Sequence, residues 1–375
     1  MILEKLTVNN FKNIRFAELE FSSKMNCFLG NNGMGKSNLL DAIHYLSFCR
    51  SFSGLTDARL ITDSEQFLML KGEYMRHQTP EDIQAAYDAG RKKVFKRKGK
   101  PYKRLSEHIG LFPAVLVAPH DIDLINGSSE ERRRFIDQII SQGDPRYLDS
   151  LIRYGHLLEQ RNRMLRDKIS DRTLFEAVEI PMAAAASYVS EARRRWIREF
   201  VPVFNRYYAA IAGDNPAEEV QMRYDTRLTE GQPMSLLDLL DANRGRDEAV
   251  GHTSVGIHRD DIEMMLNGLP VRRTASQGQC KTYVIAMRFA QYDFLNHATG
   301  VYPLLLLDDI FDRLDAQRVA RIVKIVSGDD FGQTFITDTN LSHLDSIISE
   351  VKGDHRLFTV DRGSFSVVNR QEDKQ

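Results

Sequence analysis

The stretch FLGNNGMGKSNLLDAI, residues 28–43, decides the fold class of this chain. Residues 30–37 fit the pattern G-x-x-x-x-G-K-[ST] and follow a short apolar run at 27–29. Apolar residues then recur at helical spacing over 39–46. This order of strand, loop and helix predicts a phosphate-binding loop, although a glycine-rich turn with an incidental lysine is the alternative. Kinases, GTPases, motors and DNA-repair ATPases all use such loops, so the loop alone leaves the function open.

The loop residues have distinct chemical tasks. Its glycines allow positive φ angles, which turn backbone N–H groups inward toward an anion at the positive end of the following helix. Lys36 is expected to reach the β- and γ-phosphates of ATP, and the Ser37 hydroxyl is expected to bind Mg²⁺. The predicted nucleotide-binding set of the loop is Gly30, Asn31, Asn32, Gly33, Met34, Gly35, Lys36 and Ser37.

The composition is that of an ordinary globular protein. The chain has 375 residues, 42% of them hydrophobic, and a formal net charge of −1, so it can bury a sizeable core. Its three cysteines show no C-x-x-C spacing, which argues against a disulfide framework or a zinc site. No apolar run approaches the ~18 residues of a membrane span, and residues 1–13 alternate as a strand does. We therefore expect a cytoplasmic protein without membrane contact.

A basic segment offers a candidate DNA contact. The stretch RKKVFKRKGKPYKR, residues 91–104, has nine Lys or Arg residues among fourteen, with a turn expected around Gly99. Lys96, Arg97 and Lys98 are the predicted contacts with DNA phosphates. The alternative interpretation is a solvated charged face.

Changes in hydrophobic periodicity divide the chain into three parts. Residues 1–120 contain mostly strands and turns around the phosphate loop, and residues 121–250 are mainly helical, with Ser129 expected to cap the first long helix. Residues 251–375 alternate apolar strands with helices. The pattern predicts an α/β ATPase head that is split by an inserted helical arm.

The second half of the nucleotide site lies far along the sequence. The segment YPLLLLDDIFDRLD places Asp308 and Asp309 directly after four leucines, as a central parallel strand ending in carboxylates would. Asp308 would hold Mg²⁺, and Asp309 would orient and deprotonate the attacking water. Lys36, Asp308 and Asp309 are thus the candidate catalytic residues.

Between these two halves lies RRTASQGQCKTYVIAMRFAQ, which resembles the signature motif of ABC-type ATPases. The resemblance implies that Ser276, Gly278 and Gln279, at a helix N-terminus, bind the γ-phosphate of a nucleotide held by another subunit. Thr337 and Asp338 end a later strand where ABC ATPases carry a γ-phosphate-sensing histidine, so one of them is the candidate switch.

Nearly the whole chain resembles the RecF family of DNA-repair ATPases, relatives of the SMC-type chromosome proteins. LEKLTVNNFKNI is similar to the family's N-terminal strand with its N-F-[KR]-N corner, and GIHRDDIEMMLNG is similar to its G-P-H-R-D-D stretch. APHDIDLINGSSEERRRFID matches the family signature at Pro119, Gly127, Arg132, Arg133, Phe135 and Asp137. Departures occur at His120, Ser129, Cys280 and Asp312, where the family usually has an acid, proline, glutamine and serine.

The resemblance implies an ABC/SMC-like ATPase head with mixed sheets around the phosphate loop. It implies that ATP and Mg²⁺ close a homodimer, which grips double-stranded DNA near single-strand/double-strand junctions, and that weak, DNA-stimulated hydrolysis releases it. The implied partners are RecR- and RecO-type mediators of recombinational repair and replication, at the nucleoid. Two alternatives stay open: the ATPase subunit of an overcoming-lysogenisation-type defence nuclease, and a non-hydrolysing DNA-binding module, which Asp309 disfavours.

Overall fold

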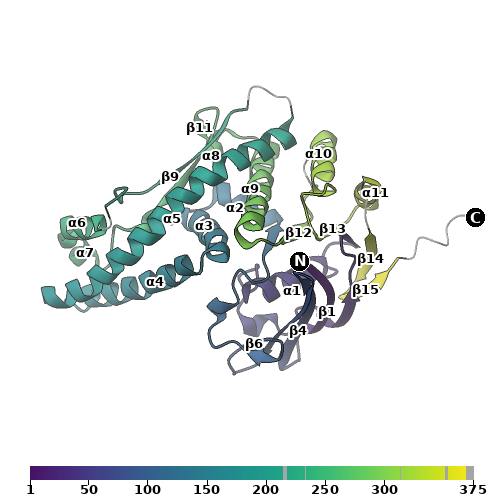
Figure 1. Cartoon of the computed structure of the whole chain (residues 1–375), viewed down its shortest axis with the longest axis horizontal. Coiled ribbons are helices and arrows are strands. Elements are labelled where there is room, and N and C mark those ends of the chain that lie inside the picture. Colours follow the sequence, from purple (N-terminus) through teal and green to yellow (C-terminus); the bar gives the residue numbers. More distant parts are fainter. Residues whose placement is uncertain (214–217, 233, 313, 351–353, 369–375) are drawn as a thin grey trace, which may run out of the picture. The chain divides into compact units, whose positions relative to one another are not determined.

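The computed structural model describes residues 1–213, 218–232, 234–312, 314–350 and 354–368. The chain divides into two compact units (Figure 1). We call Met1–Asp121, Ala209–Gly213 and Gln277–Gln375 the head, and Ile122–Tyr208 and Asp214–Ser276 the arm.

The head is the α/β unit. Its main elements are β1 (Ile2–Phe11), β2 (Ile14–Glu20), β3 (Met25–Leu29), α1 (Lys36–Phe48), β4 (Phe67–Arg76), β5 (Thr79–Asp88), β6 (Val94–Arg97), β7 (Lys100–Pro101), β8 (Ala114–Val117), α9 (Gln277–Thr299), β12 (Leu304–Asp308), α10 (Ala316–Val326), β13 (Thr334–Asp338), α11 (Leu341–Glu350), β14 (His355–Asp361) and β15 (Ser364–Val367).

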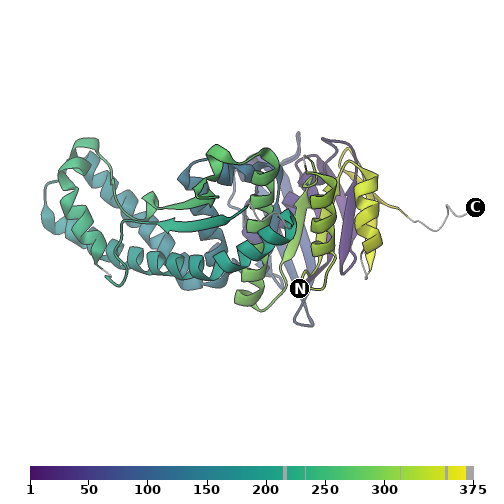
Figure 2. The ribbon, with the colours of Figure 1, turned by 90° about the horizontal axis from the view of Figure 1, so that it is seen from above.

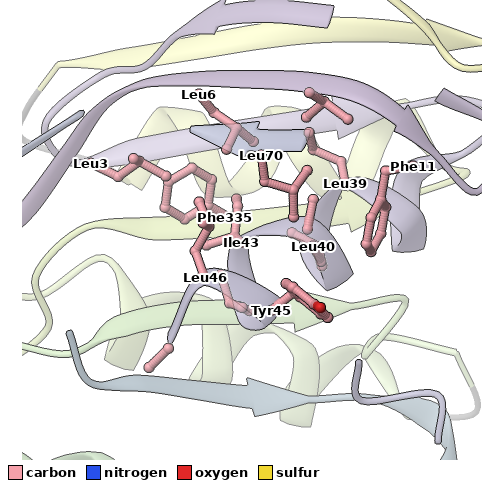
Figure 3. Close-up of a cluster of buried hydrophobic side chains, with 14 of the residues drawn as sticks. Leu3, Leu6, Phe11, Leu39, Leu40, Ile43, Tyr45, Leu46, Leu70 and Phe335 are labelled. Atoms are coloured by element: carbon pink, nitrogen blue, oxygen red, sulfur yellow. The ribbon is translucent and has the colours of Figure 1, made fainter. Parts of the chain in front are cut away.

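Two six-stranded sheets enclose the helix that follows the phosphate loop. The first sheet, in the order β2-β1-β4-β5-β6-β7, is antiparallel, and the second, in the order β15-β14-β3-β13-β12-β8, has a parallel centre. Leu39, Leu40 and Ile43 of α1 share one buried cluster with Leu70 of the first sheet and Phe335 of the second (Figure 3). Burying each such side chain contributes about 1.5–3 kcal/mol. The core of the head thereby fixes the position of α1 and of the loop before it.

The register of the second sheet brings three strand ends together. Strands β3, β13 and β12 are neighbours and run parallel, with Leu29 opposite Asp338 and Thr337 opposite Asp308. All five residues of β12 are buried, as its continuous apolar run predicts. The loop after β3 and the acidic ends of β12 and β13 consequently share one edge of the sheet.

The arm is mainly helical and contains a three-stranded sheet in the order β11-β10-β9. Its elements are α2 (Asp123–Asn126), α3 (Ser129–Gly143), α4 (Pro145–Arg166), α5 (Arg172–Ala212, whose last residues belong to the head), β9 (Val220–Asp225), α6 (Ser235–Ala242), α7 (Arg244–Val250), β10 (Asp261–Leu266), β11 (Leu269–Pro270) and α8 (Val271–Thr274).

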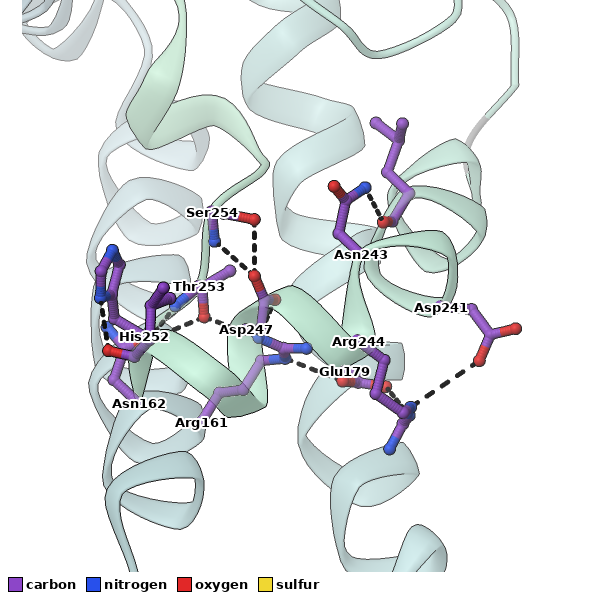
Figure 4. A network of polar contacts seen from close by, with 12 residues as sticks. Arg161, Asn162, Glu179, Asp241, Asn243, Arg244, Asp247, His252, Thr253 and Ser254 are labelled. Atoms are coloured by element: carbon purple, nitrogen blue, oxygen red, sulfur yellow. Dashed lines mark hydrogen bonds and ion pairs between the residues drawn. The ribbon is translucent and has the colours of Figure 1, made fainter. Parts of the chain in front are cut away.

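A buried guanidinium ties the arm helices together. Arg161 of α4 donates from Nε to Glu179 of α5 at 2.8 Å, and from Nη1 to Asp247 of α7 at 2.8 Å and to Thr253 at 2.9 Å (Figure 4). Arg161 and Asp247 are fully buried. Removing one partner of such a pair leaves an uncompensated buried charge, which destabilises a fold by about 3–5 kcal/mol.

A second set of ion pairs joins two of the three sequence stretches that carry the family resemblance, residues 118–137 and 256–268. Arg132 of α3 binds both carboxylate oxygens of Asp261, at 2.6 and 2.9 Å. Arg193 of α5 binds Asp137 at 2.8 Å and Asp260 at 3.1 Å. These contacts, together with the pairing of β10 with β9, hold the chain around Asp260 within the arm.

Two details differ from the sequence-based expectations. Residues 251–276, which the sequence placed in the head, cluster with the arm, because these ion pairs and strand pairings hold them there. Ser128 caps α3 by accepting from the Glu130 N–H at 3.3 Å, whereas Ser129, the expected cap, is the first helical residue. Within the residues that the structure describes, no helix combines the length and apolar composition that crossing a membrane requires.

Candidate nucleotide site

The phosphate loop connects β3 to α1 within the head. β3 ends at Leu29 and α1 begins at Lys36, so the loop occupies the positions expected from the sequence. Gly33 and Gly35 have φ angles of 80° and 113°, in the left-handed region that favours glycine. Gly35 is also the N-cap residue of α1, where the first helical N–H groups are unpaired and the helix dipole is positive. Such a loop attracts an anion.

Lys36 places its charge inside this loop. The side chain is buried, and its Nζ donates to the carbonyl oxygens of Gly30 at 2.7 Å and Asn31 at 3.2 Å. The ammonium is therefore held by the same residues that were expected to surround the phosphates.

The expected metal ligands Ser37 and Asp308 lie in direct contact. The Ser37 hydroxyl donates to Oδ1 of Asp308 at 2.8 Å, and the Thr337 hydroxyl donates to the same oxygen at 2.8 Å. Burial raises the pKa of Asp308 above its ordinary value, against these two hydrogen bonds and the charge of Lys36, which lower it. A carboxylate beside a hydroxyl fits Mg²⁺, which binds few protein oxygens and completes its shell with phosphate oxygens and water.

Asp309 occupies a left-handed backbone position beside this pair. Its φ angle is 44°, in the left-handed region that aspartate adopts more readily than most residues other than glycine. Its N–H donates to the Thr337 hydroxyl at 3.1 Å, so one threonine orients both aspartates. Burial is the main cause that raises the pKa of Asp309, and the nearby Asp308 and Asp338 add to it while Lys36 opposes it.

The signature residues lie around the start of α9. Gly278 and Gln279 are in its first turn, and Ser276 immediately precedes it. A Cβ added to Gly278 would lie 2.8 Å from Nη1 of Arg318, so a larger residue there would have to displace that side chain. Ser276 is the last residue of the arm, whereas Gly278 and Gln279 belong to the head. Their part in binding a nucleotide stays a prediction.

Sequence reasoning missed two polar residues beside the site. Asn13 accepts from Asn38 of α1 at 2.8 Å, and its amide lies against Gly35. His343, in the first turn of α11, lies with Nδ1 2.9 Å from the carboxylate of Asp338. A histidine five residues after the strand end was a visible signal for the second contact. Asn13 is the last residue of the N-F-[KR]-N corner, which carried the family resemblance but was given no role at the site.

The basic segment forms a hairpin in the antiparallel sheet. β6 and β7 pair, and the turn lies at Lys98 and Gly99, with φ angles of 50° and 72°. Arg97 donates to both oxygens of Glu81 at 2.9 and 2.8 Å, and Lys98 lies 3.2 Å from the same carboxylate. The Arg97 hydrogen bond is the first cause that lowers the pKa of Glu81. The three predicted DNA contacts are therefore not equivalent.

Together, the loop, the paired strand ends and the two-sheet head define a P-loop ATPase head of the ABC and SMC type. A family model described as the RecF/RecN/SMC N terminal domain matches residues 2–353. With the full-length relatives below, this match shows that the chain belongs to the RecF family of DNA replication and repair proteins.

Two full-length relatives are named DNA replication and repair protein RecF. The chain is 50% identical over 363 residues to that of Parabacteroides distasonis, covering 97% of this chain and 98% of the relative. It is 46% identical over 377 residues to that of Bacteroides fragilis, covering 100% of both chains.

The solved structures agree with this assignment. A structure titled as the recombination mediator protein RecF-ATP in the RecFOR pathway has a TM-score of 0.87 and 28% identity, covering 98% of both chains. An Smc head domain from Pyrococcus furiosus, solved with an extended coiled coil and bound to part of ScpA, has a TM-score of 0.56 and 17% identity, covering 98% of this chain and 96% of that chain. The second likeness shows the fold alone.

Proposed function

We propose that the head binds ATP together with Mg²⁺ at the phosphate loop. The observation that carries this proposal is the 2.8 Å hydrogen bond from the Ser37 hydroxyl to Oδ1 of Asp308. It lies at the edge of the sheet, where the phosphate loop leads into α1. Bound Mg²⁺ would supply the positive charge that neutralises the β- and γ-phosphates. Lys36 would bind the same phosphates, and loop amides would surround them. The RecF-ATP title of a structural relative supports ATP as the nucleotide.

The proposed reaction is weak, DNA-stimulated hydrolysis of ATP. Asp309 would accept a proton from the attacking water and hold that water in line with the γ-phosphate. The raised pKa of Asp309 makes it a better proton acceptor than an ordinary aspartate. Thr337 would keep both aspartates oriented through its two hydrogen bonds. Asp338 with its partner His343 is the candidate for sensing the γ-phosphate.

The proposed output is an ATP-dependent homodimer. Ser276, Gly278 and Gln279 would bind the γ-phosphate of the nucleotide held by the other subunit, since the positive end of a helix attracts anions. The dimer would hold double-stranded DNA at junctions with single strands and release it after hydrolysis. The output would be DNA binding and not a reaction on the DNA, because the nucleotide would favour the dimer over the monomer. RecR- and RecO-type mediators are the proposed partners, which the RecFOR pathway in a relative's title supports.

Light scattering tests this mechanism. Ser276→Arg should retain ATP binding by the monomer but lose ATP-induced dimers, because the bulk of arginine would oppose closure on a nucleotide. Ser23→Arg, at an exposed serine of the head, is the matched control and should dimerise as the wild type does. A wild type that stays monomeric with ATP, or a Ser276→Arg variant that dimerises normally, would contradict the mechanism.

An ATPase assay then tests hydrolysis. Phosphate release by the wild type should be slow without DNA and should rise when duplex DNA is added. A rate of ATP hydrolysis that is the same with and without DNA would contradict the proposed coupling between hydrolysis and the release of DNA.

A further inference from the structure

The C-terminal hairpin of the head lies beside the phosphate loop. β14 pairs in parallel with β3, on the side opposite β13, and Thr359 lies opposite Leu29, the last residue before the loop. β15 returns antiparallel to β14 through a turn at Arg362 and Gly363. Figures 1 and 2 show this yellow hairpin beside the purple N-terminal strands.

The hairpin contacts the loop through backbone atoms. The Gly363 N–H donates to the carbonyl oxygen of Met34, at the centre of the loop, at 2.7 Å. A Cβ added to Gly363 would lie 2.3 Å from the carbonyl oxygen of Asn13, whose amide lies against Gly35. A Cβ added to Gly30 would lie 2.5 Å from the Val360 carbonyl oxygen. Because backbone meets backbone at these points, rotation of a side chain cannot relieve a displacement.

This contact reduces the conformational entropy that the loop would lose when a nucleotide binds. Gly33 and Gly35 permit the conformation that binds phosphate, but glycine also loses the most conformational entropy when it is fixed. A loop that is held before the ligand arrives avoids part of this loss at binding, which strengthens affinity. Lys36 fixes the loop only from within, whereas the Gly363 hydrogen bond fixes its centre from outside.

We infer that the turn Asp361–Ser364 is a positioning element of the phosphate loop, with Gly363 as the positioning residue. It holds the loop with its amides directed toward the nucleotide, although it carries no nucleotide-binding motif itself. The inference rests on the proposed binding of ATP. It predicts that diphosphate and triphosphate nucleotides both depend on the turn, because both place a β-phosphate in the loop.

The basic hairpin supplies a matched control. Lys98 and Gly99 have φ angles of 50° and 72°, close to the 46° and 81° of Arg362 and Gly363, and each turn pairs a cation with a glycine. A Cβ added to Gly99 would meet no atom within 4 Å. Substitutions at Gly99 thus introduce the same backbone strain without the contact to the loop region.

The experiment compares ADP binding by calorimetry in Gly363→Ala, Gly363→Asn and the two corresponding Gly99 variants. Asparagine tolerates positive φ better than alanine does, yet it retains the Cβ that collides with Asn13. Both Gly363 variants should bind ADP about 10-fold or more weakly, whereas the Gly99 variants should bind like the wild type. Hydrogen exchange of nucleotide-free protein should be faster at residues 30–37 in the Gly363 variants alone.

Equal ADP affinity in wild type and both Gly363 variants would overturn the inference and leave the proposed function intact. A wild type that binds neither ADP nor ATP would instead remove the proposed function, and this inference with it. If the Gly363 variants do not fold, hydrogen exchange of the wild type with and without ADP still tests the inference. ADP should then slow hydrogen exchange at residues 361–364 together with residues 30–37, and unchanged exchange at the turn would contradict the inference.

Discussion

Replacing Lys96 should weaken the salt dependence of DNA binding, whereas replacing Arg97 should leave it nearly unchanged. Consecutive side chains of a strand point to opposite faces of the sheet. Phe95 of β6 is buried in the core, so Lys96 points to the other face and Arg97 to the face of Phe95. Arg97 is also engaged by Glu81 through two hydrogen bonds. One duplex cannot contact both side chains equally.

The magnitude follows from the number of phosphates contacted. Each contact contributes about 0.9 to the slope of log K against log salt, so three equal contacts would contribute about 2.7. On the structure, Lys96 should contribute about 0.9, Lys98 between 0 and about 0.9, and Arg97 close to 0. Lys98 is intermediate because it is about half exposed but shares Glu81 with Arg97. Neutralising all three should therefore lower the slope by about 1–2.

Fluorescence anisotropy with a labelled duplex, saturating ATP and a series of KCl concentrations measures these slopes. The Lys96→Ala, Arg97→Ala and triple variants are compared with the wild type, after thermal unfolding has shown that each is folded. An unchanged slope in the triple variant would show that the segment is a solvated charged face. A loss for Arg97→Ala as large as that for Lys96→Ala would refute the argument from strand alternation and from the Glu81 pair.

Three further predictions concern the nucleotide site. Lys36→Ala should lose most ATP affinity, because it removes the cation inside the loop; unchanged binding by calorimetry would reject the assignment. Asp309→Asn should bind ATP but hydrolyse it at least ~10²-fold more slowly in a phosphate-release assay, as expected for loss of a positioned base, and normal turnover would place the base elsewhere. Asp308→Asn should stabilise the nucleotide-free protein near neutral pH in urea unfolding. Burial raises the folded-state pKa of Asp308, so its contribution to stability is present below the ordinary carboxyl pKa and lost as pH rises through the raised value. The advantage of the variant should shrink on acidification, and an advantage that grows would contradict the sign of this shift.

Local sequence patterns predicted the parts of the fold that depend on local chemistry. The phosphate loop required glycines and a lysine at fixed spacing, and the buried strand β12 required an unbroken apolar run before Asp308. The helical insertion was visible because its hydrophobic period differs from that of the strands. The order of these motifs along the chain predicted that Ser37 and Asp308 would share one metal site, and the two side chains are in contact.

Contacts between distant segments could not be predicted in the same way. Thr337 was expected at the site, but its hydrogen bonds to both aspartates depend on the exact parallel register of β12 and β13. The Glu81 partner of Arg97 depends on the pairing of β5 with β6. The boundary of the arm in the sequence depends on the ion pair of Arg132 with Asp261, which lies more than a hundred residues further along the chain. Such pairings are set by tertiary packing, on which a single sequence carries little direct information.

The candidate nucleotide site is completed by the last strands of the chain as well as by its first. β3, which leads into the phosphate loop, has β13 on one side and β14 on the other, and both come after the arm in the sequence. Gln333 strengthens this closure, because its amide donates to the Leu3 carbonyl at 2.8 Å and accepts from the Leu3 N–H at 2.7 Å, both buried. Residues 1–121 therefore lack the strands that flank β3, and the loop acquires the Gly363 hydrogen bond only when the C-terminal strands dock. A nucleotide that binds this candidate site would therefore stabilise the form of the head in which both ends of the chain are paired. The topology of one sheet would thus couple nucleotide binding to the docking of the C-terminal strands.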